Sequence, residues 1–367
     1  MKIKDITNSL ETWAPLMYQE DYDNAGLLVG NSNWACTGII VSLDTTIETI
    51  QSAIKNKYNL IISHHPIIFK GLKKINGKNE IEKCIIEAIK NDIAIYAIHT
   101  NLDNVITGVN YEIANKIKLQ NCKILNPTKN NVLKLRVYVP ISHKQVLLDA
   151  LFKAGAGKIG LYNECSFTFE GIGTYQAQQG STPYLGEIGK THTEPESCIE
   201  VVLDKAVEKN VMEALHLHHP YQTIAFDLIN IENKHAEIGA GLIGNLKDEL
   251  NETDFLNHLC TQFQLKIIKH TKFLHKKIKK VAICGGAGSF LISKAIQAGA
   301  DCYISADFKY HDFFEANNQL IIMDIGHWES EQFTSNIIID FLKKKFPTFA
   351  SLLRMEETNP INYYIKK

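Results

Sequence analysis

Residues 59–66, NLIISHHP, form an apolar run that ends in two histidines and a proline. An apolar run of this length between polar segments is typical of a strand that is buried on both faces of a parallel sheet. An amphipathic helix is predicted next, over residues 79–92, and a second apolar strand over residues 93–103. Upstream, a strand over 38–44 and a helix over 46–57 give the same alternation. This part of the chain therefore predicts an α/β fold with helices on both faces of the sheet.

The last part of the chain repeats this order of elements. The strands are predicted over residues 279–286, 300–307 and 319–327, and the helices over residues 288–299, 309–318 and 329–346. In this alignment His65 matches Asp307 at the end of one strand, and His99 matches His327 at the end of the next. We interpret the chain as two related βα halves.

The middle of the chain has a different pattern. Residues 133–140 alternate apolar and polar side chains, as a half-exposed strand does, and a helix, a glycine-rich hairpin, a strand, a helix and a strand follow. Two β-α-β-like sets around a hairpin predict a small ferredoxin-like α+β domain. We therefore expect a core of residues 1–128 and 241–367 that is interrupted by an insert over 129–240, which suits a chain of 367 residues.

The composition excludes several classes of protein. Lys plus Arg count 39 and Asp plus Glu count 40, and this balance argues against a dedicated polybasic binder of nucleic acids or membrane surfaces. The eight cysteines include no CxxC pair, which excludes zinc ribbons and zinc fingers. The N-terminus lacks the apolar region of a signal peptide, and no run of about 18 apolar residues occurs. We expect a cytoplasmic protein with reduced thiols and with neither membrane nor nucleic-acid partners.

Side chains that can bind metal follow three of the predicted strands. His64 and His65 end the first of them, Asp103 follows the next, and His327 ends the last. Glu331 lies four residues after His327, on the same face of a helix. Because the carboxyl ends of parallel strands line the functional crevice of such sheets, we expect these five side chains to meet. Adjacent strand residues point to opposite faces, so each of the paired histidines is expected to face its own cation unless the strand turns there.

The chemistry of these five side chains predicts a dinuclear metal centre, although each alone could simply cap a strand or a helix. Three imidazoles and two carboxylates suit Zn²⁺, Fe²⁺, Mn²⁺ or Co²⁺ better than Ca²⁺. Five ligands exceed the need of one tetrahedral site, so we expect two divalent ions per chain with a bridging carboxylate. Two ions about 3.5–4 Å apart can generate hydroxide near neutral pH and stabilise an oxyanion.

Four further residues are candidates for lining the site. Asp23 and Asn24 precede a glycine, so they could equally form a plain turn. Asp44 ends the first strand of the core. His99 is expected to support the ligands or to pack at its strand end rather than to act as a sixth ligand.

Two residues beside the predicted ligands are candidates for catalysis, with a merely structural role as the alternative for each. Asp307 could orient a ligand histidine as an outer carboxylate. His311 could act as a general acid or base near neutral pH. Glu331 is the other candidate for proton transfer.

Two further motifs resemble functional sites. His218 and His219 form a second histidine pair at a helix end, with no nearby carboxylates. We interpret this pair as a helix C-terminal cap aided by the helix dipole. Residues 284–289, CGGAGS, resemble a turn that cradles phosphate between a strand and a helix. Near two metals such a turn could receive a phosphate, so nucleotides are candidate ligands.

Motifs spread over the whole predicted core carry a family resemblance. They are YDNAGLLVG (22–30), SHHP (63–66), HTNLDN (99–104), GVN (108–110), CGGAGSFL (284–291), SADFKYHD (305–312) and GHWESE (326–331). In this set the chain resembles the GTP cyclohydrolase I type 2 homologues, also called Nif-three-like proteins. The middle segment resembles the PII/CutA-like insert of longer members, through GAGKIGLYNECSF (155–167), GIGTY (171–175), GEIGK (186–190) and HPY (219–221). The chain departs from the insert pattern at Gln222, where family inserts often carry an acidic residue.

The resemblance implies a metal-binding α/β core and a ring-shaped homohexamer built from trimers. Its metal ligands fall on the same five residues, His64, His65, Asp103, His327 and Glu331. The family name implies a reaction that opens the guanine ring of GTP.

We predict a metal-dependent hydrolase that uses activated water on a nucleotide-like or other small substrate. Polar residues beyond the ligands, such as Asp44, Asp307 and His311, favour catalysis, since structural metal sites are normally closed. The alternative is a non-catalytic metal-binding ring, with a regulatory or scaffold role, whose insert senses a small molecule.

Overall fold

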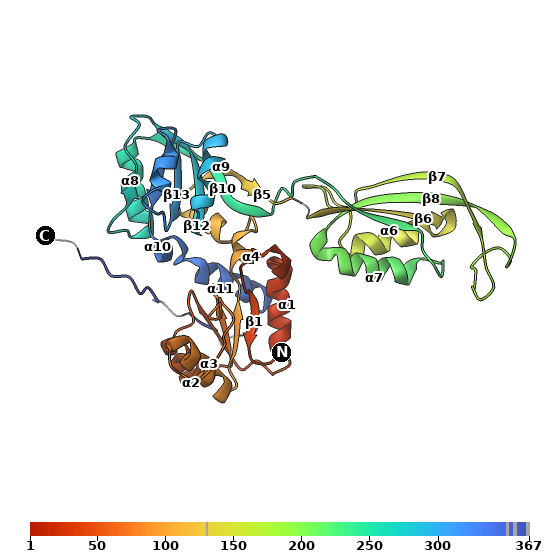
Figure 1. The fold of residues 1–367 in the computed structure, drawn as a ribbon, viewed down its shortest axis with the longest axis horizontal. Coiled ribbons are helices and arrows are strands. Elements are labelled where there is room, and N and C mark those ends of the chain that lie inside the picture. The colour runs from red at the N-terminus through yellow and green to blue at the C-terminus, as the bar shows by residue number, and fades with distance from the viewer. Residues whose placement is uncertain (130, 350–351, 355–357, 365–367) are drawn as a thin grey trace. The chain divides into compact units, whose positions relative to one another are not determined.

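The computed structural model describes residues 1–129, 131–349, 352–354 and 358–364 (Figure 1). They form two compact units. We call Met1–Pro127 with Glu237–Lys367 the core unit, and Thr128–Ala236 the inserted unit. Sheets and helices occur in both units, so the predicted mixed α/β fold is confirmed. Within the described ranges, no helix combines the length and the apolar character needed to cross a lipid bilayer.

The first sheet of the core unit has the strand order β1-β4-β3-β2-β15. Its strands are β1 (Gly26–Val29), β2 (Ile39–Ser42), β3 (Leu60–Ser63), β4 (Ala94–Ala97) and β15 (Leu352–Arg354). Four of them run parallel, and β1 pairs antiparallel with β4. Every residue of β2, β3 and β4 is buried, which explains their uninterrupted apolar sequences.

The second sheet of the core unit has the order β11-β14-β13-β12-β10-β5. Its strands are β5 (Gln120–Pro127), β10 (Gly239–Leu250), β11 (Lys269–His270), β12 (Ile278–Ala287), β13 (Cys302–Ala306) and β14 (Ile321–Asp324). The strands β12, β13 and β14 are parallel neighbours, as β2, β3 and β4 are in the first sheet. In each sheet the last of these three parallel strands also pairs with an antiparallel neighbour. The pairs are β4 with β1 and β14 with β11. The two halves of the core unit thus share one strand arrangement.

Helices of the core unit cover both sheets. They are α1 (Ile3–Trp13), α2 (Ile47–Asn56), α3 (Glu80–Lys90), α4 (Thr100–Asp103), α5 (Val109–Lys116), α8 (Glu252–Phe263), α9 (Ile292–Gln297), α10 (His327–Glu331) and α11 (Thr334–Lys345). In the first half, Ile50 of α2 and Ile85 of α3 pack in one apolar cluster with Ile61 of β3. Asn79 begins α3 by accepting a hydrogen bond from the Glu82 backbone N–H at 2.9 Å.

Several predicted elements differ from the structure. The strand predicted over 319–327 ends at Asp324, so His327 begins α10 and does not end a strand. The strand predicted over 93–103 ends at Ala97, because the Asn101 side chain accepts the His99 N–H and starts the helical turn α4. The helix predicted over 329–346 is divided into α10 and α11. In α10 the Ser330 hydroxyl donates to the His327 carbonyl, a local bond that competes with helix continuation. The helix predicted over 309–318 is only the short 3₁₀ helix Asp312–Ala316.

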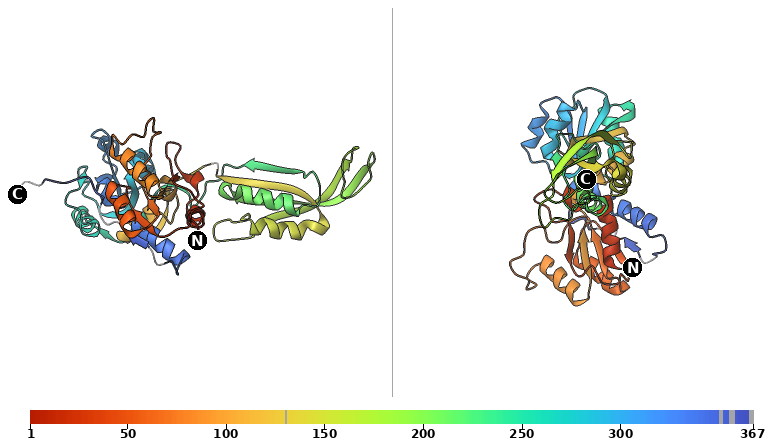
Figure 2. Two further views of the ribbon diagram at one scale, coloured as in Figure 1. Left: turned by 90° about the horizontal axis from the view of Figure 1, so that it is seen from below. Right: turned by 90° about the vertical axis from the view of Figure 1, so that its right-hand side faces the viewer.

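The inserted unit is a four-stranded antiparallel sheet with the order β7-β8-β6-β9 and two helices (Figures 1 and 2). Its elements are β6 (Val132–Pro140), α6 (Lys144–Lys153), β7 (Ser166–Gln176), β8 (Thr191–Asp204), α7 (Glu208–His218) and β9 (Phe226–Asn230). Alternate residues of β6 are buried against both helices. Strands β7 and β8 extend beyond the helices as a long hairpin (Figure 2).

Candidate metal centre

Strand register brings the predicted metal ligands of the core unit together. Ser42 pairs with Ser63, and Ser63 pairs with Ala97, so β2, β3 and β4 end side by side. In the second sheet, Ser305 of β13 pairs with Asp324 of β14. The segments after these strands carry the histidines and carboxylates that the sequence singles out.

The His64–His65 pair lies just beyond the end of β3. The Ser63 hydroxyl donates to the His65 carbonyl at 2.8 Å and supports a bend at this point. Because the strand has already ended, the two rings do not point to opposite faces; their centroids are 5.0 Å apart. Both Nε2 atoms approach the same Glu331 oxygen, at 3.9 Å from His64 and 3.0 Å from His65.

One group of ligand atoms consists of His65, His327 and Glu331. The two Nε2 atoms are 3.3 Å apart, and they lie 3.0 and 3.2 Å from the Glu331 Oε2. Ligand atoms bound at about 2.0–2.1 Å to one ion are separated by about 3.0–3.4 Å in tetrahedral or octahedral geometry. The three atoms therefore have the spacing of three corners of a coordination polyhedron, and this group could hold a metal ion.

A second group consists of His64, His65 and His99, whose ligand atoms lie within 4.8 Å of one another. Asp103 adjoins it, with its Oδ1 3.6 Å from the His64 Nε2. Both of these atoms are buried and have no hydrogen-bond partner among the described residues. An unpaired buried acceptor is costly, and a cation that both atoms bind would satisfy the pair. The donor set thus fits a divalent ion.

Hydrogen bonds at Nδ1 fix the orientation of all four histidine rings. The acceptors are Ile98 O for His64 at 2.8 Å, Asp44 for His65 at 2.7 Å, Asp23 for His99 at 2.7 Å and Asp307 for His327 at 2.7 Å. Since Nδ1 carries the donated proton, each neutral ring presents the lone pair of Nε2 to the cluster. This arrangement is the one found around metal-ligating histidines.

The histidines and carboxylates of the cluster shift one another's pKa values. Burial alone would lower the pKa of His65, but hydrogen bonds to two carboxylates raise it to about 10. Burial likewise opposes the charge of His327, whereas Glu331 raises the pKa of that ring to about 11. Burial and the nearby Glu331 charge raise the pKa of Asp103 well above its usual range. Without a metal these shifts favour the protonated forms of His65, His327 and Asp103, so a metal ion bound here would displace protons.

Four of the five candidate ligands line a cavity of about 440 Å³ in the core unit, and His99 lines it too, whereas the fully buried His64 does not. The four are His65, Asp103, His327 and Glu331. Three exposed aromatic rings, those of Tyr22, Phe69 and Phe290, also line it. The Phe69 ring lies 6.2 Å from the Tyr22 ring and 6.2 Å from the His99 ring, between centroids. No Lys or Arg is among the residues that line this cavity. The site is therefore accessible to a small molecule and offers it aromatic surface beside the ligand cluster.

Comparison with known proteins assigns the chain to a family. The family model described as Duf34/NIF3 (NGG1p interacting factor 3) matches residues 1–360. The chain belongs to the Duf34/NIF3 family. A relative from Bacillus subtilis (strain 168), named GTP cyclohydrolase 1 type 2 homolog, is 36% identical over 327 residues, which are 89% of this chain and 88% of the relative. A relative of the same name from Staphylococcus epidermidis is 34% identical and covers 99% of this chain and 100% of its own length.

Solved structures of related proteins share this Duf34/NIF3 fold over the whole chain. The Bacillus cereus protein related to NIF3 matches with a TM-score of 0.86 and 32% identity, over 99% of both chains. Staphylococcus aureus protein SA1388 matches with a TM-score of 0.77 and 27% identity, again over 99% of both chains. These matches cover the core unit and the inserted unit alike.

Other candidate residues of this Duf34/NIF3 chain have different surroundings. Asn24 donates from Nδ2 to the Ile68 carbonyl at 2.6 Å and so joins two loops. His311 is exposed, its ring contacts those of Tyr310 and Phe314, and it is not among the residues that line the cavity. A role of His311 as an acid or base stays a prediction.

The second histidine pair has a structural role. His219 is the C-cap residue of α7, as predicted. Its Nε2 donates to the Tyr138 carbonyl at 2.9 Å, and its Nδ1 accepts from the Tyr221 N–H at 3.1 Å. Burial lowers the pKa of this ring. The neutral ring therefore acts through two hydrogen bonds. The expected contribution of a charged ring to the helix dipole does not apply to it.

The first two glycines of the glycine-rich motif lie against the Glu331 side chain, and their backbone N–H groups are used within the protein. The Gly285 N–H donates to Asn110 at 2.9 Å, and the Gly286 N–H donates to Ser330 at 3.0 Å, so neither is free for a phosphate. Gly286 has φ of 60°, and a Cβ there would lie 2.4 Å from the Glu331 Oε1. Only glycine leaves room for this carboxylate.

Two threonines that support the site were not found from the sequence. The Thr358 hydroxyl donates to the Asp44 Oδ2 at 2.6 Å, so it fixes the carboxylate that orients His65. Thr100 donates from its N–H to the Asp23 Oδ2 at 3.1 Å, and its hydroxyl donates to the same oxygen. Thr100 stands within the HTNLDN motif, which could have drawn attention to it, whereas no motif contains Thr358.

Replacing Asp307 with Asn should weaken metal binding by roughly 10–100-fold, the usual cost of losing an outer partner of a ligating histidine. Asp307 accepts the Nδ1 proton of His327 at 2.7 Å, and an amide is a poorer acceptor for it. Metal affinity can be measured by competition with a chelator. The control is Asp312→Asn in the same loop, where the carboxylate accepts the Lys309 N–H. Equal metal affinity in both variants would show that Asp307 does not support the site.

Proposed function

We propose that this chain binds two divalent metal ions and acts as a metal-dependent hydrolase. The observation that carries the proposal is the position of the Glu331 Oε2, within 4.0 Å of the Nε2 atoms of His64, His65 and His327. A carboxylate oxygen among three histidines suits a bridging ligand. One ion would be held by His65, His327 and Glu331, and the other by His64, Asp103 and Glu331, with His99 as a further candidate ligand.

The residues of the chain have distinct tasks in this proposal. Two such ions supply, when bound, a nucleophile from water near neutral pH and positive charge for an oxyanion. Asp44 and Asp307 keep the Nδ1 protons of His65 and His327 in place and so aim both Nε2 atoms inward. The buried Glu331 is the carboxylate that we propose for proton transfer, with the exposed His311 as the alternative acid or base.

The cavity favours catalysis over a purely structural metal site. Structural sites are normally closed by protein ligands, whereas this cluster lines an accessible cavity of about 440 Å³. That volume suits a small molecule. The relatives are named GTP cyclohydrolase 1 type 2 homolog, which supports a nucleotide-like substrate among the candidates.

The alternative is a non-catalytic metal-binding ring with a regulatory or scaffold role. A pocket of about 710 Å³ in the inserted unit favours it, since a sensor needs a second ligand site. The order β-α-β-β-α-β and the sheet order β7-β8-β6-β9 support a ferredoxin-like, PII/CutA-like insert. Both functions are compatible with the homohexamer that the family resemblance implies.

A hydrolysis screen distinguishes the two functions. The metal-stripped protein is loaded separately with Zn²⁺, Mn²⁺, Fe²⁺ and Co²⁺ and assayed on GTP, simple nucleosides and activated esters. We expect turnover that disappears with a chelator and returns when metal is added back. Stoichiometric metal without turnover of any of these compounds would favour the regulatory function.

A further inference from the structure

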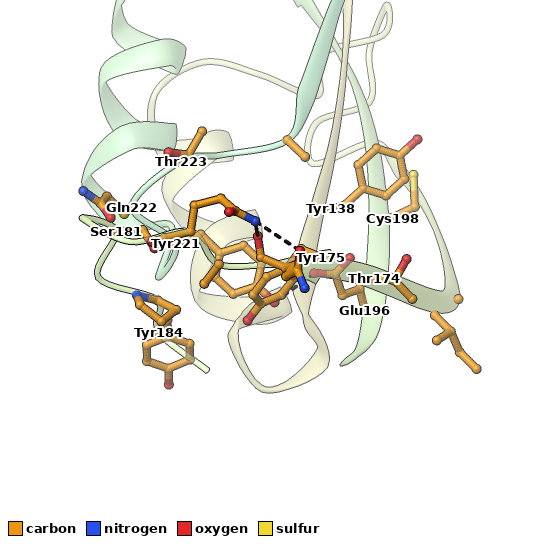
Figure 3. A pocket seen from close by; sticks show the side chains of 18 of the residues that line it. Tyr138, Thr174, Tyr175, Ser181, Tyr184, Glu196, Cys198, Tyr221, Gln222 and Thr223 are labelled. Carbon is orange, nitrogen blue, oxygen red and sulfur yellow. Dashed lines mark hydrogen bonds between the residues drawn. The ribbon is translucent and has the colours of Figure 1, made fainter. Parts of the chain in front are cut away.

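The inserted unit contains a pocket of about 710 Å³ that the metal centre does not explain (Figure 3). It is lined by the β7–β8 hairpin, by the end of β6 and by the segment that follows α7. The Gln222 side chain accepts the Thr182 N–H at 2.9 Å and so joins two of the lining segments. The pocket lies within a single compact unit and is built from its own residues.

Three tyrosines form a continuous aromatic array in this pocket. The Tyr221 ring lies 5.8 Å from the Tyr175 ring and 6.3 Å from the Tyr184 ring, between centroids. Figure 3 shows the side chains of Tyr175 and Tyr221 next to each other. The Tyr175 hydroxyl donates a hydrogen bond to the Leu185 carbonyl at 2.8 Å. The faces of tyrosine rings carry negative potential and attract cations within about 6 Å of the ring centre.

Glu196 is the one charged residue among those that line the pocket. Its Oε1 accepts a hydrogen bond from the Tyr221 hydroxyl at 2.9 Å. Its Oε2 lies close to Gly173, where a Cβ would come within 2.2 Å of it, so the glycine leaves room for the carboxylate. Burial and the Glu196 charge raise the pKa of Tyr221 above its usual range, so this hydroxyl remains a donor.

The neighbouring carboxylates of β8 have basic partners, and Glu196 does not. Glu194 pairs with His192 at 3.1 Å, and Glu200 pairs with Lys134 and Arg136. Across the described part of the chain, no Lys, Arg or His lies within 4.0 Å of the Glu196 carboxylate. The pocket therefore combines an unpaired negative charge with three electron-rich rings.

We propose that this pocket binds an organic cation, whose quaternary ammonium or protonated amine lies between the tyrosine rings and Glu196. Cation–π contacts and the carboxylate together offset the cost of removing such a group from water. The exposed Phe169 and Ile172 provide apolar surface for the rest of the molecule, and the volume suits a ligand of drug size. A metal ion fits less well, because one carboxylate supplies too few ligands for it.

The test compares two probes of the same shape that differ in charge, (3-hydroxyphenyl)trimethylammonium and 3-tert-butylphenol. Their binding to the full-length protein is measured by isothermal titration calorimetry. We expect the cation to bind saturably, one molecule per chain, and about tenfold more tightly than the uncharged phenol. Equal affinity for both probes, or no binding of either, would overturn the proposal.

Substitutions assign the binding to this pocket and not to the aromatic cavity of the core unit. Glu196→Gln and Tyr184→Ala should each lower the affinity for the cation about five- to tenfold, whereas Tyr184→Phe, which keeps the ring, should not. The matched control is Glu194→Gln, which changes a paired carboxylate of the same strand outside the pocket lining. Tyr184 is half exposed, so its substitution should leave the fold intact, which circular dichroism checks. Cation binding that persists in both Glu196→Gln and Tyr184→Ala would contradict the assignment.

Discussion

Glu331→Gln is expected to remove both metal ions from the protein. The Glu331 Oε2 lies 3.0 Å from the Nε2 of His65, 3.2 Å from that of His327 and 3.9 Å from that of His64. An amide of the same shape carries no charge and bridges two cations poorly, so both ions lose a ligand at once. The loss of affinity should exceed the roughly 10–100-fold cost of removing an outer partner.

Elemental analysis of the purified protein measures this loss. The matched control is Glu329→Gln, which changes another buried carboxylate of α10 that accepts a hydrogen bond from Tyr363 at 3.1 Å. We expect the control to keep the metal content of the parent. Full metal content in Glu331→Gln would show that this residue is not a ligand.

Gly286→Ala should have the second largest effect, through both stability and metal binding. Gly286 has φ of 60°, where a residue other than glycine costs about 1–2 kcal/mol. The new Cβ would also lie 2.4 Å from the Glu331 Oε1 and 3.2 Å from the His327 Nε2. Since the backbone of β12 cannot move far within the sheet, the Glu331 and His327 side chains have to shift, and the metal is lost.

Gly299→Ala separates these two effects. Gly299 has a similar φ of 69°, but a Cβ there would meet only the Lys280 Nζ, at 3.8 Å. Urea unfolding should show a lower free energy of unfolding in both variants, and metal analysis should show a loss only in Gly286→Ala. Metal binding by Gly286→Ala at the level of Gly299→Ala would contradict the geometry described for Glu331.

The arrangement of strands could be predicted from the sequence because it depends on local patterns. The buried strands β2, β3 and β4 are short apolar runs, and these runs are visible without any knowledge of tertiary contacts. The ends of elements were harder to predict. The break between α10 and α11 and the early end of β4 depend on side-chain hydrogen bonds of Ser330 and Asn101, which a hydrophobic pattern does not contain.

The candidate ligands could be proposed from their positions after strands, and the structure brings all five into one cluster. The orientation of the rings could not be predicted, because it depends on contacts between distant segments. Thr358 and Asp44 are 314 residues apart, and no sequence pattern joins them. The bend after Ser63 likewise decides that His64 and His65 face the same carboxylate, where alternation along a strand predicted opposite faces.

Anomalous diffraction from crystals of the metal-loaded protein tests the proposed dinuclear centre most directly. Data collected on both sides of the absorption edge of the loaded metal give the position of each ion. The account predicts two peaks per chain, about 3.5–4 Å apart, on either side of the Glu331 Oε2 and within bonding distance of the histidine Nε2 atoms. A single peak, or peaks away from His64, His65 and His327, would contradict it.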